Sequence, residues 1–214
     1  MSVAAVIVAA GQGTRFGAQK QFSVLEGETV AARSVRTART VAESIVLVVP
    51  EGYEGDGEGA DVVVVGGATR AASVRRGLEL CRDAHVVVVH DAARPLASAL
   101  LFRAVLDAVL AGADGAVPGI PVTDTVKRVV ANDGATVVAA TVQRDELVTV
   151  QTPQAFRREV LERAHADGDE ASDDAALVEA LGARIVVVEG EPRNVKITHA
   201  SDLEVLSVLQ RSVP

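Results

Sequence analysis

Residues 3–15 read VAAVIVAAGQGTR, an unbroken apolar run that passes directly into a glycine-rich segment. Further valine-rich runs occupy residues 45–49, 62–65, 86–89 and 185–188. Runs that are apolar at every position indicate strands buried on both faces, which is typical of a parallel sheet covered by helices. Residues 3–9 are therefore predicted to form one strand of such a sheet, followed by a loop that starts near Gly11.

Helical patterns lie between these strands. They occupy residues 29–40, 69–82, 97–111, 157–166, 173–181 and 201–210. The alternation predicts an α/β fold, a Rossmann-like doubly wound layer whose mostly parallel sheet carries helices on both faces. Ligands of such sheets bind outside the carboxyl ends of the strands, so the residues that follow each valine run are the candidate site.

Residues 122–150 break this rhythm. Threonine and valine lie on either side of Asn132-Asp133-Gly134, which is a hairpin turn signal. An isolated hairpin is marginal in water, so we expect this β-hairpin arm to protrude and pack against a second subunit; the alternative is a hairpin that lies on its own domain. We otherwise expect one domain over residues 1–214, with residues 51–60 as a plain solvated loop.

Charge and composition limit the partners. The formal net charge of -8 argues against a nucleic-acid or anionic-membrane surface. Cys81 is the only cysteine, and its Ala/Leu/Arg surroundings predict a buried thiol in a reducing compartment. No apolar run approaches the ~18 residues of a spanning helix, and no basic residue precedes the apolar start. We expect a cytoplasmic protein with no membrane or nucleic-acid partner.

The Gly11-Gln12-Gly13 turn follows a buried strand, where glycines let backbone N–H groups approach a phosphate. The Rossmann pattern G-x-G-x-x-G fails because Phe16 stands at the third glycine position. The P-loop pattern fails at Phe16 when counted from Gly11, and at Ala18 when counted from Gly13. Both of the common glycine-loop patterns therefore fail for this segment.

Arg15 and Lys20 add two cations to this loop. Preorganised cations stabilise the charge that accumulates on a departing pyrophosphate, so the pair favours chemistry on a nucleoside triphosphate. The alternative is a solvated turn with incidental charges. The chain has three lysines, Lys20, Lys127 and Lys196, each beside a distinctive motif, which favours a specific role for the compact ammonium group.

Asp91 directly follows the valine run 86–89, at the predicted carboxyl edge of the sheet. A single carboxylate suits Mg2+, which completes its shell with water and substrate phosphates. Arg94 is then available to bind an anionic substrate. The alternative for Asp91 is a helix cap or turn. His90 has no partner at metal-ligand spacing and is predicted to be structural.

Further polar clusters lie on predicted loops at residues 123–127, 152–156 and 172–174, while residues 194–196 are predicted to end a late strand. Each has a structural reading of its own; residues 172–174, for example, make a good helix N-cap. Together they predict one site that binds two phosphorylated ligands.

Six motifs in this order resemble the 2-C-methyl-D-erythritol 4-phosphate cytidylyltransferase family of the non-mevalonate isoprenoid pathway. They are AAGQGTR (9–15), KQ (20–21), HDAARP (90–95), DTVK (124–127), TPQ (152–154) and NVKIT (194–198). The resemblance covers nearly the whole chain. Ribitol-5-phosphate cytidylyltransferases share much of it, so another polyol phosphate is the alternative substrate.

The resemblance implies transfer of a cytidylyl group from CTP to 2-C-methyl-D-erythritol 4-phosphate, with Mg2+ as the metal, in a homodimer that shares its site. The implied roles fall into three sets. Arg15 and Lys20 stabilise the transition state; Ala10, Gly11, Gly13, Gly67, Ser73 and Asp91 bind the nucleotide, with Asp91 also serving Mg2+; and Arg94, Thr125, Arg144 and Lys196 bind the sugar phosphate, the last two also acting catalytically. Thr125 and Arg144 would come from the partner's arm.

Two departures from the family pattern stand out. Gln19 replaces the usual proline before the Lys-Gln pair, which predicts a less rigid loop near Lys20. Ser172 replaces the usual threonine and keeps the hydroxyl. We do not expect the cyclodiphosphate synthase domain of some relatives within these 214 residues. Rival functions are a nicotinamide oxidoreductase, against which Phe16 counts, and a nucleotide sensor without catalysis.

Overall fold

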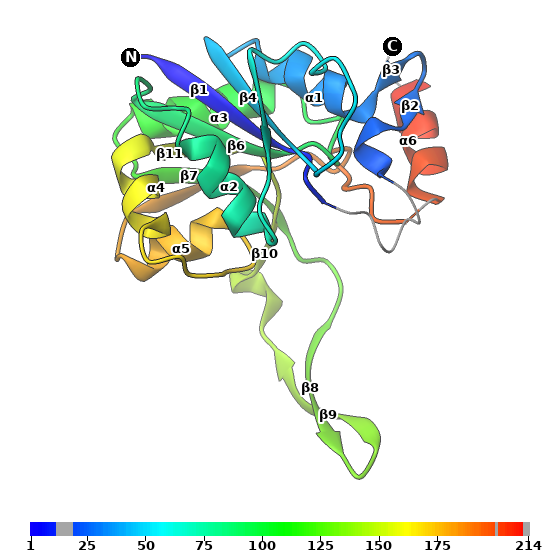
Figure 1. Ribbon diagram of the computed structural model, residues 1–214. Coiled ribbons are helices and arrows are strands. Elements are labelled where there is room, and N and C mark those ends of the chain that lie inside the picture. The colour runs from blue at the N-terminus through cyan, green and yellow to red at the C-terminus, as the bar shows by residue number, and fades with distance from the viewer. Residues whose placement is uncertain (12–18, 200, 212–214) are drawn as a thin grey trace.

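The computed structural model describes residues 1–11, 19–199 and 201–211. Its centre is an eight-stranded sheet with the order β10-β7-β11-β6-β1-β4-β5, and β12 also pairs with β7 (Figure 1). The strands of this sheet are β1 (Val3–Val8), β4 (Ser44–Val49), β5 (Val62–Val65), β6 (Val86–Asp91), β7 (Gly115–Pro121), β10 (Val148–Val150), β11 (Gln154–Arg157) and β12 (Ile185–Glu189). The five predicted strands are all confirmed.

Helices cover both faces of the sheet. They are α1 (Val30–Ala38), α2 (Arg70–Leu78), α3 (Ala99–Leu110), α4 (Arg158–His165) and α5 (Asp174–Ala180). A sixth helix, α6 (Ser201–Arg211), packs in a separate cluster through Leu206 with Leu25 and Ile197, and the short 3-10 turns are η1 (Lys20–Phe22) and η2 (Arg144–Glu146). Along β1, Val3, Ala5 and Ile7 pack with α1 and α3, whereas Ala4 and Val6 pack with α2, α4 and α5. This alternation confirms the doubly wound fold, and each buried valine side chain stabilises it by about 1.5–3 kcal/mol.

The sheet is mixed, not purely parallel. β11 pairs antiparallel with β6 and β7, and β10 pairs antiparallel with β7. The expectation of a loop over residues 152–156 is therefore wrong beyond Pro153, since β11 lies there. Residues 194–196 do not end a strand either: β12 stops at Glu189, and Pro192, which has no N–H, lies in the irregular segment that follows.

Helix α2 is shorter than predicted. It ends at Leu78, and residues 79–84 turn back through bonds such as Cys81 N–H to the Leu78 carbonyl (3.0 Å). Cys81 thus lies just beyond the helix, but its burial is confirmed at 3% exposure. Burial raises the pKa of the Cys81 thiol to about 12, which keeps it unreactive. None of the described helices is long and apolar enough to cross a membrane.

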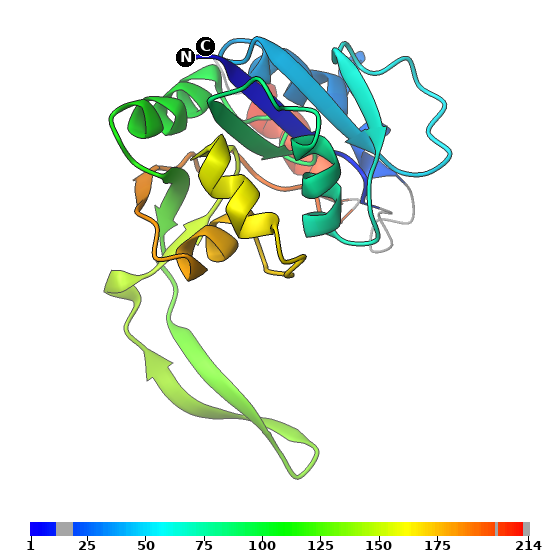
Figure 2. The ribbon, with the colours of Figure 1, turned by 60° about the vertical axis from the view of Figure 1, so that its left-hand side comes forward.

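The hairpin arm is present as predicted. Strands β8 (Val126–Asn132) and β9 (Ala135–Val142) pair antiparallel around Asp133 and Gly134, whose positive φ angles of 47° and 79° suit a tight hairpin turn. The arm projects away from the sheet in both orientations, and its residues 127–141 are exposed (Figures 1 and 2). The alternative of a hairpin lying on its own domain is therefore wrong for this chain.

The segment 51–60 is not a plain solvated loop. The Tyr53 ring packs on Phe22 of η1, with centroids 4.8 Å apart, and the Tyr53 hydroxyl accepts the Gly57 N–H (3.1 Å). Tyr53, the one tyrosine of the chain, anchors this segment to the domain. The Gly- and Glu-rich composition of the segment does not predict this packing. A small antiparallel pair, β2 (Val24–Leu25) and β3 (Glu28–Thr29), follows η1. The loop thus buttresses the segment that begins with Lys20.

Candidate functional site

The loops after β1 and β5 meet at the carboxyl edge of the sheet. A Cβ on Gly66 would lie 2.4 Å from the Ala10 Cβ and 2.7 Å from the Ser73 Oγ, so only glycine lets the two loops approach this closely. Next to it, the Gly67 N–H donates to the Ser73 Oγ (3.1 Å). The structure therefore brings together Ala10, Gly67 and Ser73, three of the residues that the sequence predicts to bind the nucleotide.

Gly11 begins the glycine-rich loop and has no described atom within 4 Å of the position that a Cβ would take. The buried Gln21 side chain donates to the carbonyls of Ala9 (2.6 Å) and Gly11 (3.0 Å), which fixes the start of the loop. Gln21 therefore has a structural role within the Lys-Gln pair. Gly13 and Arg15 lie outside the described residues.

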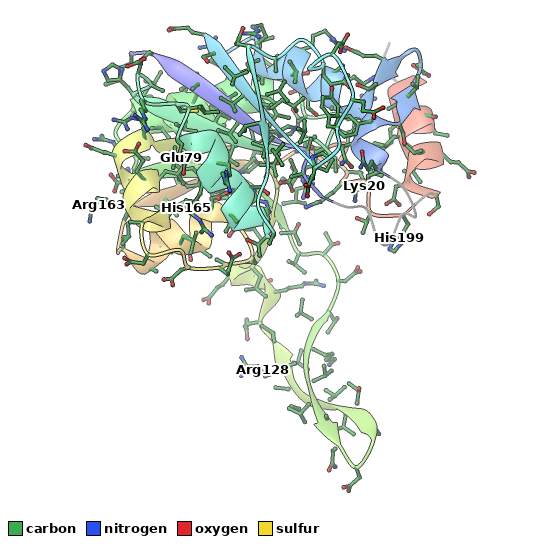
Figure 3. The ribbon with its side chains drawn as sticks, in the orientation of Figure 1. Lys20, Glu79, Arg128, Arg163, His165 and His199 are labelled. Carbon is green, nitrogen blue, oxygen red and sulfur yellow. The ribbon has the colours of Figure 1, made fainter. Side chains whose placement is uncertain are left out.

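Lys20 opens η1, and its Nζ donates to the Ile197 carbonyl. Ile197 is fully buried, and its N–H donates to the Ala93 carbonyl (2.8 Å). Figure 3 shows Lys20 on the same side of the molecule as His199, which follows this segment in the chain. One clamped segment, residues 196–198, therefore places Lys196 and holds Lys20.

Asp91 ends β6 and lies at the centre of a charge cluster. Its Oδ1 accepts from Arg70 Nε (3.1 Å), and its Oδ2 accepts from Lys196 Nζ (2.6 Å). Burial alone would raise the pKa of Asp91, but the charges of Arg70 and Lys196 outweigh it and hold the pKa well below its usual range. The carboxylate is therefore ionised throughout the physiological range, with cations on both oxygens.

His90 is fully buried beside Asp91 and closes a chain of hydrogen bonds. The Asp91 N–H donates to Thr152 Oγ1 (3.0 Å), Thr152 Oγ1 lies 3.2 Å from His90 Nδ1, and His90 Nε2 lies 3.2 Å from the Arg94 carbonyl. Because a carbonyl only accepts, the proton is assigned to Nε2, and Thr152 then donates to Nδ1. Burial lowers the pKa of His90 to about 4. The predicted structural role of His90 agrees with this geometry.

The low pKa of His90 predicts a loss of stability in mild acid. In the unfolded chain the imidazole takes up a proton near its ordinary pKa of about 6.5, whereas the folded state resists protonation down to about 4. The stabilisation is complete above about pH 6.5 and declines as the pH falls, by about 2 kcal/mol between about pH 7.5 and about pH 5. Urea unfolding of wild type and His90→Gln at both pH values measures it. The variant should lose less stability on acidification; equal losses would contradict the assignment.

Arg94 and the polar segment 190–196 form the next layer. Arg94 Nη1 donates to the Asn194 carbonyl (2.7 Å). Asn194 is fully buried, and its Nδ2 donates to the Thr152 carbonyl (2.8 Å) and to Gln151 Oε1 (3.2 Å). These amides hold the segment bearing Lys196 against the turn before β11. The clusters at 152–154 and 194–196 are thus brought to Asp91 as predicted, although 194–196 is irregular.

Thr125 and Arg144 lie elsewhere. Both are exposed at the root of the arm, where Arg144 donates to the Thr123 carbonyl. In the part of the chain that the structure describes, neither side chain forms a hydrogen bond or ion pair with Asp91 or Lys196. The described residues of one chain therefore do not bring the whole predicted sugar-phosphate site together.

Two site features do not follow from the motifs. Arg70 contacts Asp91 although it belongs to no quoted motif; its signal is its place in the segment that follows the valine run 62–65. Asp174 contacts Arg70 Nη1 (2.8 Å), so it does more than prepare a helix start. The N-cap of α5 is Asp173, whose side chain accepts from the Ala176 N–H. The predicted helix cap is therefore confirmed at Asp173, while Asp174 contacts Arg70 of the site.

The fold and the site together define a class: a doubly wound α/β protein with a glycine-rich segment directly after β1 and a lysine- and arginine-rich cluster at the carboxyl edge, suited to phosphorylated ligands. A family model described as 2-C-methyl-D-erythritol 4-phosphate cytidylyltransferase (IspD) matches residues 3–211. The chain belongs to this family.

Individual relatives agree with the family match. The chain is 42% identical over 210 residues to the 2-C-methyl-D-erythritol 4-phosphate cytidylyltransferase of Rhodococcus jostii (strain RHA1), covering 94% of this chain and 92% of that protein. It is 46% identical over 215 residues to a bifunctional enzyme IspD/IspF of Anaeromyxobacter sp. (strain Fw109-5), covering 94% of this chain but only 55% of that protein. The chain thus spans about half the length of such bifunctional relatives.

A crystal structure of 2-C-methyl-D-erythritol 4-phosphate cytidylyltransferase from Thermus thermophilus is also similar. It superposes with a TM-score of 0.84 at 41% sequence identity, covering 99% of this chain and 100% of that one. The likeness extends the family match to the whole fold.

Proposed function

We propose that this protein transfers a cytidylyl group from CTP to 2-C-methyl-D-erythritol 4-phosphate, giving 4-diphosphocytidyl-2-C-methyl-D-erythritol and pyrophosphate for isoprenoid precursor synthesis. The observation that carries the proposal is the Asp91 cluster. Lys196 and Arg70 contact an ionised carboxylate at the sheet edge. The glycine loop that starts at Gly11 follows the neighbouring strand. Two phosphorylated ligands can meet between these features.

The chemistry is an exchange of two bonds to phosphorus. An oxygen of the polyol phosphate forms a bond to the α-phosphorus of CTP, the bond from that phosphorus to the bridging oxygen breaks, and pyrophosphate leaves with the electron pair. A phosphate monoester has its second pKa at about 6, so the nucleophile is already ionised at neutral pH. No general base is needed, and His90 fits this scheme because both of its ring nitrogens are engaged.

Catalysis then rests on positioning and charge. We assign Lys20 and Arg15 to the charge that develops on the triphosphate, and Lys196 and Arg94 to the polyol phosphate. Ala10, Gly11, Gly13, Gly67 and Ser73 are assigned to the nucleotide. The side chain of Lys196 is 44% exposed, so it has room to turn from Asp91 toward a substrate.

Mg2+ is the metal that the family resemblance implies. The described residues contain no group of three or more His, Cys, Asp or Glu placed to hold an ion. A single ionised Asp91 fits Mg2+ when CTP phosphates and water supply the other ligands. The ion would neutralise phosphate charge; the part of this chain is to hold Asp91 ionised and oriented.

The arm at 122–150 supports a homodimer that shares its sites. Thr125 and Arg144 stand at its root, apart from the Asp91 cluster, and the valines of the arm, such as Val129 (52% exposed) and Val138 (62%), are uncovered. We propose that a second copy covers the arm and receives both residues. The compartment we propose is the cytoplasm, in keeping with one buried thiol.

Pyrophosphate release tests the function. We expect rapid release only with CTP and 2-C-methyl-D-erythritol 4-phosphate together, when CTP, UTP, GTP and ATP are each combined with that substrate and with ribitol 5-phosphate. Faster release with ribitol 5-phosphate would move the assignment to the other polyol. CTP binding without release in any combination would instead indicate a nucleotide sensor and overturn the proposal.

A further inference from the structure

Arg70 joins two buried carboxylates. It is the first residue of α2, directly after the N-cap Thr69. Its Nε donates to Asp91 Oδ1 (3.1 Å), and its Nη1 donates to Asp174 Oδ2 (2.8 Å). The side chains of Asp91 and Asp174 are only 10% and 1% exposed. One guanidinium therefore links the end of β6 to the start of α5.

Asp174 is a fixed anchor for this link. Its other oxygen lies 3.0 Å from Nε2 of His165, whose side chain is 2% exposed. His165 is on α4, which packs against α5 (Figure 3). The preceding Asp173 caps α5 and accepts from Gln154 Nε2 (2.8 Å). The position of Asp174 is thus set by the fold, independently of any ligand.

Asp91 has its second cation on the open side of the site. Lys196 Nζ lies 2.6 Å from Asp91 Oδ2, and the proposed function gives Lys196 to the polyol phosphate. When Lys196 turns to that phosphate, Asp91 keeps its negative charge in a nearly buried position. Unless Arg70 or the proposed Mg2+ supplies a positive charge, this nearly buried carboxylate is costly and would retain the lysine.

We propose that Arg70 is a positioning residue for cytidylyl transfer. Braced by Asp174, it fixes the orientation of Asp91 and keeps its charge paired while Lys196 is engaged with the substrate. A lysine at this position would not reproduce the role, because one ammonium group lacks the planar fork that reaches two carboxylates. The inference rests on the proposed function of the site.

Arg70→Gln tests this role, with Arg75→Gln as the matched control. Arg75 is on the same helix and pairs with Glu170 (3.2 Å), away from Asp91. We expect kcat/KM for the polyol phosphate to fall by about 10- to 100-fold in Arg70→Gln, as for other residues that orient a ligand-binding carboxylate. Arg75→Gln should match wild type. Unchanged kinetics in Arg70→Gln would overturn the role.

A double variant separates positioning from stability. Arg70→Gln leaves Asp174 buried without its arginine, so its melting temperature should fall. Arg70→Gln with Asp174→Asn removes that stranded charge and should recover much of the melting temperature, while kcat/KM stays low because Asp91 still lacks its partner. Recovery of both would show a purely structural Arg70 and overturn the inference. A wild type without pyrophosphate release would overturn the proposed function itself, and this role with it.

Discussion

Lys20→Ala is expected to lower kcat by about 100- to 1000-fold, the usual effect of removing one preorganised donor from developing transition-state charge. The KM for the polyol phosphate should change little, because we assign that ligand to Lys196 and Arg94. The large expected fall in kcat follows from the placement of Lys20. Its Nζ donates to the Ile197 carbonyl, so the ammonium group is already positioned before substrate arrives. Steady-state kinetics of pyrophosphate release measure both constants.

Arg36→Ala is the control for Lys20→Ala. Arg36 is an exposed cation on α1, paired with Glu28 (2.8 Å), and an exposed pair of this kind contributes little. Its kinetics should equal those of wild type. Equal turnover in Lys20→Ala and wild type would remove Lys20 from the chemistry, and a rise in KM alone would reassign it to ground-state binding.

The central fold could be predicted because its signals are local. The runs at 3–9, 45–49 and 86–89 are apolar at every position, and β1, β4 and β6 are buried on both faces. The Asp133-Gly134 turn signal likewise predicts the hairpin from local sequence. β11 could not be predicted in the same way, because its four residues form a strand only through pairing with β6 and β7.

For the candidate site too, the residues in local motifs could be predicted, whereas the contacts between distant segments could not. Asp91 and Lys196 stand in motifs, so the sequence places them as candidates. Their mutual contact, however, joins residues 105 positions apart, and Arg70 reaches Asp174 across 104 positions. Such contacts depend on how α2, β6 and α5 pack. The contact of Tyr53 with Phe22 also depends on the folded chain. The composition of residues 51–60 predicts a solvated loop, because the packing of the two rings is not visible in the local sequence.

Mixing two inactive variants is expected to restore activity. Arg144→Ala should lower kcat/KM by at least about 30-fold, since losing a charge-assisted contact to a phosphate costs about 2 kcal/mol or more. In a dimer of one Lys20→Ala and one Arg144→Ala subunit, the site that keeps Lys20 receives the intact Arg144 from the partner's arm. Random mixing makes half of the dimers mixed, each with one intact site of two, so activity should reach about a quarter of wild type. Pyrophosphate release after co-expression measures it.

The pairing of Lys20→Ala with Lys196→Ala is the control, because it distinguishes the arm from the body of the subunit. Lys20 and Lys196 are held by one segment of the same chain, so neither site of such a mixed dimer is intact and no activity should return. If activity returns when Lys20→Ala is paired with Arg144→Ala but not when it is paired with Lys196→Ala, then Arg144 acts in the site of the neighbouring subunit. Mixed dimers without recovery would mean that each arm serves its own chain. The root of the arm would then have to fold back toward Asp91, a contact absent from the described residues.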